Sequence, residues 1–193
     1  MNDEKVGHQR KSIRLSGYDY SLAGGYFITI VTKDRVSLFG KVKNGEMFPN
    51  DQGVIARNEW FKTAQLRPHL TINDDEFVVM PNHIHGIIWI KDDHVGTQRR
   101  CAPTNNRFSV GSQTLDSIVR AYKSAVTYNI YKLPGMRDVP IWQRNYYEHI
   151  IRDERNYANI FDYIQTNPLN WEQDEEKNYW GGSDSDRTFP SNL

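Results

Sequence analysis

The chain has 193 residues, with 24 basic and 24 acidic side chains, a formal net charge of zero and 12% aromatic residues. This length suits one domain with a full core, and the composition is that of a globular protein. The single cysteine excludes an intrachain disulfide and a cysteine-based zinc cluster. No apolar run approaches the roughly 20 residues that a membrane span needs, and the amino terminus lacks an apolar signal core, so we expect a cytoplasmic protein with no membrane partner.

Charge is distributed unevenly along the chain. The segment 172–193 carries six acidic and two basic residues, which leaves 18 acidic and 22 basic residues in the rest. We therefore expect three parts: a polar N-terminal arm over 1–19, a single folded domain over 20–171 and an acidic C-terminal tail over 172–193. The arm is interpreted as solvated, with phosphate contact as the alternative.

The first half of the chain predicts a strand, a hairpin and a helix. Residues 26–32 are rich in β-branched and aromatic side chains, which favours a central strand. Asn44 and Gly45 lie between two short apolar runs and predict a two-residue hairpin turn. A helix is predicted to begin after the N-cap signal at Asn50 and to end before Pro68.

The stretch 77–90 predicts two apolar strands that meet at a Pro-Asn turn, with the acidic triplet 74–76 as their solvated entry. Side chains alternate along a strand, so His83 and His85 share one face, with their Cα atoms about 6.6 Å apart. Both rings can then reach one metal ion above the sheet. The alternative is a pair of structural histidines, although two such rings are costly to bury without a partner.

The second half begins with a long aperiodic loop over 91–112, which indicates either a functional loop or a solvated insertion. A helix is predicted over 114–132, a strand over 141–152, and a final helix from the Asp153 cap to about Asn167. The resulting order predicts an α+β fold: a ferredoxin-like βαββαβ sandwich with an antiparallel sheet and an additional C-terminal helix.

The final helix places a phenol near an amide. Residues four apart lie on one helix face, so Tyr163 and Asn167 stand one above the other. A phenol can attack a phosphodiester when a divalent ion offsets the developing charge. Asn167 could add an oxygen ligand to an ion held by His83 and His85, and Mg²⁺ or Mn²⁺ would suit that set. The alternatives are a tyrosine at the edge of the core and a turn residue at the helix end.

Three sequence blocks in this order closely resemble the single-tyrosine HUH transposases, in particular the REP-associated tyrosine transposases and their insertion-sequence relatives. The blocks are Met80–Gly86, Trp142–Arg152 and Tyr163–Pro168, and the opening segment 14–20 is also similar. The resemblance spans about 14–171. His-hydrophobic-His alone is a weak signal, whereas the three ordered blocks together are specific.

The resemblance implies a metal-dependent DNA strand transferase and endonuclease on a ferredoxin-like core, with single-stranded or hairpin DNA as its substrate. His83 and His85 match the metal-binding pair. Tyr163 matches the nucleophile that forms a 5′-phosphotyrosine link and releases a 3′-hydroxyl, and Asn167 stands where the family has a third polar ligand. His149 recurs in the strand motif, and we interpret it as a structural histidine.

Other assignments stay open at this point. Tyr146, Tyr147 and Tyr157 are rival nucleophiles, ranked lower because none has an amide four residues on at a helix end. One alternative function is a phosphohydrolase that uses an activated water. The other is a non-catalytic single-strand-binding module that stacks bases on aromatic residues of the sheet, namely Tyr26, Phe27, Trp142, Tyr146 and Tyr147. A monomer and a homodimer that exchanges the tyrosine helix are both compatible with the sequence. The basic residues expected to contact DNA are Arg99, Arg100, Arg107, Arg120, Lys123 and Arg144.

Overall fold

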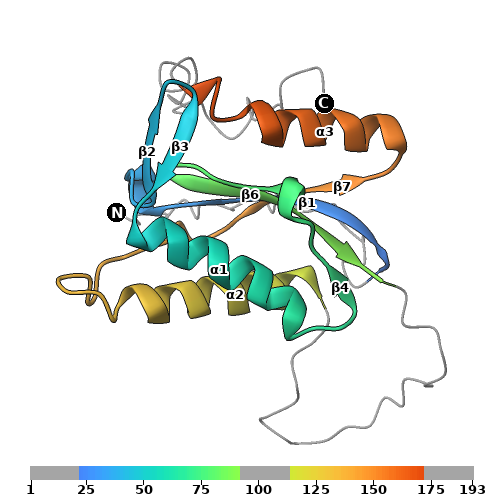
Figure 1. Ribbon diagram of the computed structural model, residues 1–193. Helices are drawn as coiled ribbons and strands as arrows, with labels where there is room; N and C mark the ends of the chain where they lie inside the picture. The colour runs from blue at the N-terminus through green and yellow to red at the C-terminus, as the bar shows by residue number, and fades with distance from the viewer. Residues whose placement is uncertain (1–21, 92–113, 172–193) are drawn as a thin grey trace, which may run out of the picture.

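A computed structural model of the chain describes residues 22–91 and 114–171. The expected arm, the acidic tail and the long loop with Arg99, Arg100 and Arg107 lie outside the described residues, so those assignments stay predictions. The described part forms three layers, with a sheet between two helices on one face and a third helix on the other (Figure 1). None of its helices is long and apolar enough to cross a membrane.

The main sheet has the strand order of a ferredoxin-like fold. Two long strands form its centre, β1 (Gly24–Val31) and β6 (His83–Ile90), and they pair antiparallel. β7 (Tyr147–Ile151) pairs with the outer side of β1, while β5 (Phe77–Val79) and β4 (Leu70–Thr71) pair with β6. The predicted fold class and the central place of β1 are therefore confirmed, although the short strand β4 was not expected.

A separate two-stranded ribbon consists of β2 (Gly40–Lys43) and β3 (Glu46–Pro49). Asn44 and Gly45 form its turn with φ values of 52° and 75°. These are the left-handed conformations that a tight hairpin needs, and Asn and Gly adopt them at low cost. The predicted hairpin is confirmed.

Three helices begin where a side chain caps the first turn. They are α1 (Asp51–Gln65), α2 (Leu115–Ile130) and α3 (Glu154–Thr166). Asn50 and Asp153, the two predicted caps, accept hydrogen bonds from backbone N–H groups at 3.0 Å and 2.8 Å. Two short 3-10 turns, η1 (Lys33–Arg35) and η2 (Asp74–Glu76), complete the elements.

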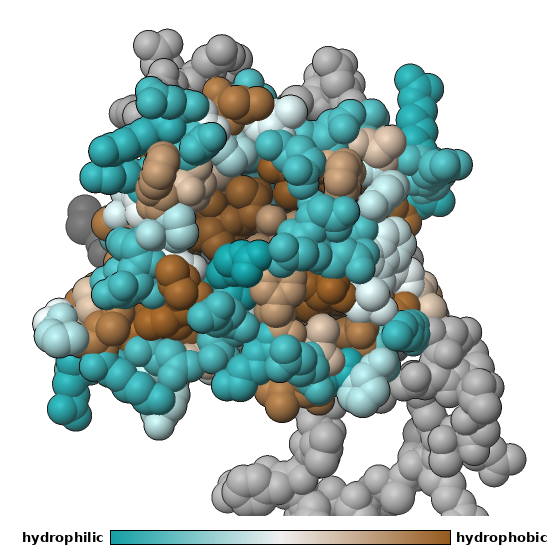
Figure 2. All heavy atoms as spheres, viewed as in Figure 1, coloured by the Kyte–Doolittle hydropathy of each residue, from teal (hydrophilic) through white to brown (hydrophobic). Residues whose placement is uncertain are grey.

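The two faces of the sheet have separate cores because side chains alternate along each strand. Ile84 and Ile88 of β6 pack in the core under α1 and α2, whereas Phe27 and Ile87 pack against α3. In the side view of Figure 2, hydrophobic side chains are visible between hydrophilic ones, above and below the level of the sheet. The helix that carries Tyr163 thus covers the histidine face of the sheet.

The last strand is shorter than the sequence predicts. The predicted strand 141–152 contains β7 over 147–151 and an isolated bridge between Trp142 and Thr32. Thr29 pairs with Tyr147 and Thr32 pairs with Trp142. An advance of three residues along β1 is therefore matched by five residues along the segment 142–147. Two residues therefore bulge out between these pairs, as in a β-bulge, and interrupt the ladder.

Candidate metal and nucleophile site

His83 and His85 lie on the same face of β6, as the alternation predicts. Their ring centroids are 4.4 Å apart. His85 is buried, with 4% of its surface exposed, and His83 is half-buried. The two imidazoles therefore converge beneath α3 at one end of the sheet.

A neighbour holds the Nδ1 atom of each imidazole. His83 Nδ1 lies 2.6 Å from Asn82 Oδ1, and His85 Nδ1 lies 2.8 Å from Thr29 Oγ1. An amide oxygen can only accept a hydrogen bond, so Nδ1 of His83 carries the proton and its Nε2 keeps a lone pair. The threonine hydroxyl can accept in the same way from His85. This arrangement, with Nδ1 satisfied and Nε2 available, is typical of metal-binding histidines.

Both rings are held in the neutral form that binds metals. Burial and, to a smaller extent, the nearby Arg35 cation lower the pKa of His83 to about 4, although a side-chain hydrogen bond with Asn167 opposes this shift. Burial also lowers the pKa of His85 well below its usual value, and the neighbouring His83 adds to the effect. Neutral imidazoles are the ligand form, so no proton has to leave before an ion binds near pH 7.

α3 brings Tyr163 over the histidine pair. The phenol oxygen lies 3.4 Å from His85 Nε2, and the two rings meet edge to face with centroids 5.1 Å apart. The other side of the tyrosine ring packs edge-on against Phe27 at 6.1 Å. The hydroxyl is thus aimed at the imidazole nitrogen that stays available for a ligand.

Asn167 closes the same site at the end of α3. Only 2% of its surface is exposed, and its side chain hydrogen-bonds His83. Trp171 covers the group, with its ring centroid 6.0 Å from that of His83. The four residues singled out in the sequence therefore lie together.

The donor set fits a divalent cation. It offers two imidazole nitrogens and one amide oxygen, which leaves further positions for substrate oxygens. In the described part of the chain, no group of three His, Cys, Asp or Glu side chains forms a metal site. Asn167 is therefore the residue that distinguishes this set from a lone histidine pair.

Tyr157, a rival nucleophile, is already engaged. Its hydroxyl donates to Glu76 Oε1 at 2.9 Å. Burial and the Glu76 carboxylate raise the pKa of Tyr157 to about 12, which makes it a poor nucleophile. Glu76 itself is buried, contrary to the expected solvated entry, because Trp89 Nε1 also donates to it at 2.8 Å. His149 lies 3.0 Å from Asn156 Oδ1, which agrees with a structural role.

The described basic residues expected to contact DNA lie away from the histidines. Arg120 and Lys123 are on α2, which packs on the other face of the sheet, and Arg144 is in the bulge before β7. Arg120 pairs with Asp116 at 3.0 Å, and its side chain stays largely exposed. Their contact with DNA stays a prediction.

Comparisons with known proteins agree with this architecture, although no protein-family model matches the chain. An uncharacterised protein of Haemophilus influenzae is 46% identical over 173 residues, covering 87% of this chain and 93% of the relative. A second protein of that organism, provisionally named a REP-associated tyrosine transposase, is 28% identical over 152 residues, covering 78% and 73%. A solved REP-associated tyrosine transposase bound to a REP hairpin superposes with a TM-score of 0.54 and 22% identity, over 93% of this chain and 98% of that one.

A ferredoxin-like sheet with a histidine pair beneath a tyrosine helix is the arrangement that the sequence resemblance implies. The chain is similar to a protein provisionally named a REP-associated tyrosine transposase, and it shares the fold of the solved one.

Proposed function

We propose that the protein is a metal-dependent DNA strand transferase that cleaves and rejoins single-stranded or hairpin DNA. The relationship to tyrosine transposases supports a transposase-like role in DNA processing. The observation that carries the finer proposal is the place of the Tyr163 hydroxyl, 3.4 Å from His85 Nε2 and beside His83 and Asn167.

In the proposed step, the Tyr163 oxygen attacks a backbone phosphorus atom. A bond forms between that oxygen and phosphorus, and the bond from phosphorus to the 3′ oxygen breaks. The phenol gives up its proton, and the departing 3′ oxygen takes one up, so the DNA gains a 3′-hydroxyl and the protein a 5′-phosphotyrosine. Attack of a 3′-hydroxyl on this link reverses the reaction and rejoins a strand.

His83, His85 and Asn167 would hold a divalent ion, Mg²⁺ or Mn²⁺. When bound, such an ion supplies positive charge that stabilises the phosphate in the transition state. The chain's own residues do the positioning: Thr29 and Asn82 fix the imidazoles, and α3 sets the phenol beside them.

A hairpin is the substrate form that we propose, because a solved transposase with the same fold is bound to a REP hairpin. The non-catalytic alternative loses two of the five aromatic residues expected to stack on bases. Tyr26 and Phe27 are 0% and 1% exposed, and α3 covers the sheet face on which Phe27 lies. Neither ring can therefore stack on a base in this structure.

The test is covalent capture of DNA. A hairpin oligonucleotide with a single-stranded flank, labelled on the 3′ side of the cut, is incubated with the protein and Mn²⁺, and protein-linked label is measured after denaturation. We expect an adduct from the parent and from Tyr157→Phe, and none from Tyr163→Phe. His83→Ala and removal of the ion with a chelator should each abolish it.

An equal adduct from Tyr163→Phe would contradict the nucleophile assignment. Multiple-turnover cleavage of the DNA without any adduct, retained in Tyr163→Phe, would instead indicate a phosphohydrolase that uses water.

A further inference from the structure

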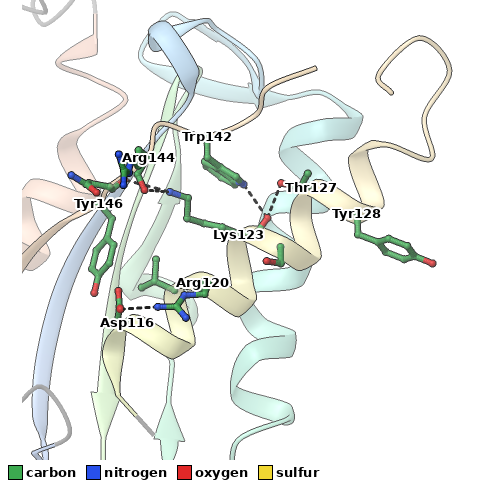
Figure 3. A pocket seen from close by; sticks show the side chains of 11 residues that line it. Asp116, Arg120, Lys123, Thr127, Tyr128, Trp142, Arg144 and Tyr146 are labelled. Atoms are coloured by element: carbon green, nitrogen blue, oxygen red, sulfur yellow. Dashed lines mark hydrogen bonds and ion pairs between the residues drawn. The ribbon is translucent and has the colours of Figure 1, made fainter. Parts of the chain in front are cut away.

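A hollow of about 560 Å³ lies on the side of the molecule opposite the histidines, between α2 and the segment 142–146 (Figure 3). Its charged lining residues are Arg120, Lys123, Arg144 and Asp116, so three cations face one anion. Aromatic rings from Trp142 and Tyr146 also line it. Basic groups beside aromatic rings are the combination that binds single-stranded nucleic acid.

The bulge before β7 forms one wall, and Lys123 fixes its shape. The Lys123 ammonium donates to the backbone carbonyl of Gln143 at 2.6 Å and reaches those of Arg144 and Asn145 at 3.5 Å and 3.4 Å. The Lys123 side chain thereby holds a segment that has left the hydrogen-bond ladder of the sheet. Lys123 is therefore a positioning residue in this structure, and its expected contact with DNA stays a prediction.

The Trp142 ring, which lines the hollow, is held in place by its neighbours. The Trp142 ring packs against Phe39 and Tyr122 with centroids 5.3 Å and 6.0 Å away, and its Nε1 donates to the Lys123 carbonyl at 3.1 Å. Arg120 and the Tyr146 ring point toward the same opening in Figure 3, whereas Tyr128 points away from it. A flat, fixed ring surrounded by cations suits a planar base and its phosphate.

The hollow is also level with the candidate active site. Thr29 of β1 pairs with His85 on one side and with Tyr147 on the other. The bulge therefore begins at the sheet edge in the same row as His85, with β1 between them. A DNA strand that passes around this edge of the sheet reaches both faces by a short path.

We propose that this hollow binds a nucleotide of the single-stranded segment that flanks the scissile phosphate. The base lies on Trp142 and Tyr146, and its phosphates contact Arg120 and Arg144, while Lys123 holds the wall in place. A duplex cannot present an unstacked base to such a surface, so the site selects single strands. This inference rests on the proposed function and adds a second point of attachment to it.

The test compares the binding of two oligonucleotides by fluorescence anisotropy over a range of salt concentrations. One is a hairpin with a long single-stranded flank, and the other is the same hairpin with a flank too short to pass the sheet edge. Arg120→Gln and Arg144→Gln should each weaken binding of the long-flank DNA about fivefold and lower its salt slope by about 0.7, the value for one lost phosphate contact with a single strand. Binding of the short-flank DNA should be unchanged.

Arg57→Gln is the matched control, because Arg57 is an ion-paired arginine on the neighbouring helix α1 and lies outside the hollow. Tyr146→Leu should weaken long-flank binding about tenfold with little change in salt slope, since it removes stacking and no charge. Equal losses with Arg57→Gln, or equal losses for both DNAs, would overturn the proposal.

Covalent capture at saturating DNA separates this inference from the proposed function. The parent protein should form the Tyr163 adduct with the long-flank DNA, and the affinities for that DNA are compared between the parent, Arg120→Gln and Arg144→Gln. Normal adduct formation with unchanged long-flank affinity would refute the hollow alone, whereas loss of the adduct in the parent protein would refute the function.

Discussion

At the scale of single residues, one hydroxyl holds the ring of His85. Thr29 Oγ1 lies 2.8 Å from His85 Nδ1, on the strand that pairs with β6. When it accepts from Nδ1, the lone pair of His85 stays on Nε2, which faces Tyr163. The threonine therefore orients an imidazole that lies on the neighbouring strand.

We expect Thr29→Val to weaken Mn²⁺ binding by about 10–100-fold, the usual range when a metal ligand loses its hydrogen-bond partner. Valine has nearly the shape of threonine and suits a strand, so folding should persist. Isothermal titration with Mn²⁺ measures the effect, and Thr71→Val on β4 is the control. Unchanged affinity in Thr29→Val would mean that another group orients the imidazole.

Lys123 predicts a pH dependence of stability. Burial lowers its pKa from 10.5 to about 8 in the folded protein. Between these values the unfolded chain binds more protons than the folded one, so this residue makes the free energy of unfolding rise with pH from about 8 to 10.5. The free energy of unfolding of the parent should therefore rise relative to that of Lys123→Met across this window. Urea unfolding at pH 7 and pH 10 measures it, and an equal difference at both would contradict the assignment.

The sequence could reveal His83, His85, Tyr163 and Asn167 because strand and helix periodicities place them by simple counting. Counting could not reveal Glu76. Three consecutive acidic residues suggest a solvated turn, and only the tertiary fold brings Trp89 and Tyr157 to the third of them. The role of Lys123 was hidden for the same reason, since its carbonyl partners come from another segment.

At the scale of elements, α3 is attached to η2 by two side chains. Tyr157 donates to the buried carboxylate of Glu76, and Gln165 donates to the Asp75 carbonyl. Tyr163 lies between these two attachment points in the helix. These two hydrogen bonds form a clamp between α3 and η2. The clamp sets the height and rotation of α3 over the sheet, and therefore the distance from the Tyr163 phenol to His85.

We expect Tyr157→Phe to lower the free energy of unfolding by about 1–3 kcal/mol, because a buried carboxylate loses one of its donors. Adduct formation at saturating DNA should slow as well, since α3 no longer holds Tyr163 in one place. Urea unfolding and covalent capture measure the two effects. Tyr128→Phe, at a residue 66% exposed on α2, should change neither, and an unaltered adduct rate in Tyr157→Phe would contradict the clamp.

Elements with local signals could be predicted, and those that depend on partners could not. The caps at Asn50 and Asp153 and the turn at Asn44 act within a few residues, so the sequence displays them. The length of β7 depends on its register against β1, and the bulge that shortens it is held by a lysine on α2.

At the scale of the whole molecule, the sheet is shared by two cores, and Gly86 is a position at which α1 packs closely against the sheet. A Cβ atom at Gly86 would lie 2.4 Å from Trp60 Cζ2 and 3.0 Å from Phe77 Cδ2. The glycine follows His85 directly and faces the α1 side of β6. Close packing of Trp60 against the sheet therefore requires the absence of a side chain next to the candidate metal site.

Gly86→Ala should lower the free energy of unfolding by about 1–3 kcal/mol, the usual cost of overpacking a core. The shift should appear in the urea midpoint without a change in slope if the fold stays cooperative. Gln65→Ala, at an exposed position near the end of α1, is the control. A midpoint equal to that of the parent would show that Trp60 moves aside at no cost.

The contact between Tyr163 and His85 has one more consequence. The phenol hydrogen bond uses the same nitrogen lone pair that a cation would need. The proposed nucleophile therefore occupies the position on His85 at which a cation would bind. An ion held by His85 would displace the hydroxyl from that nitrogen, so cation binding and release of the nucleophile would be coupled.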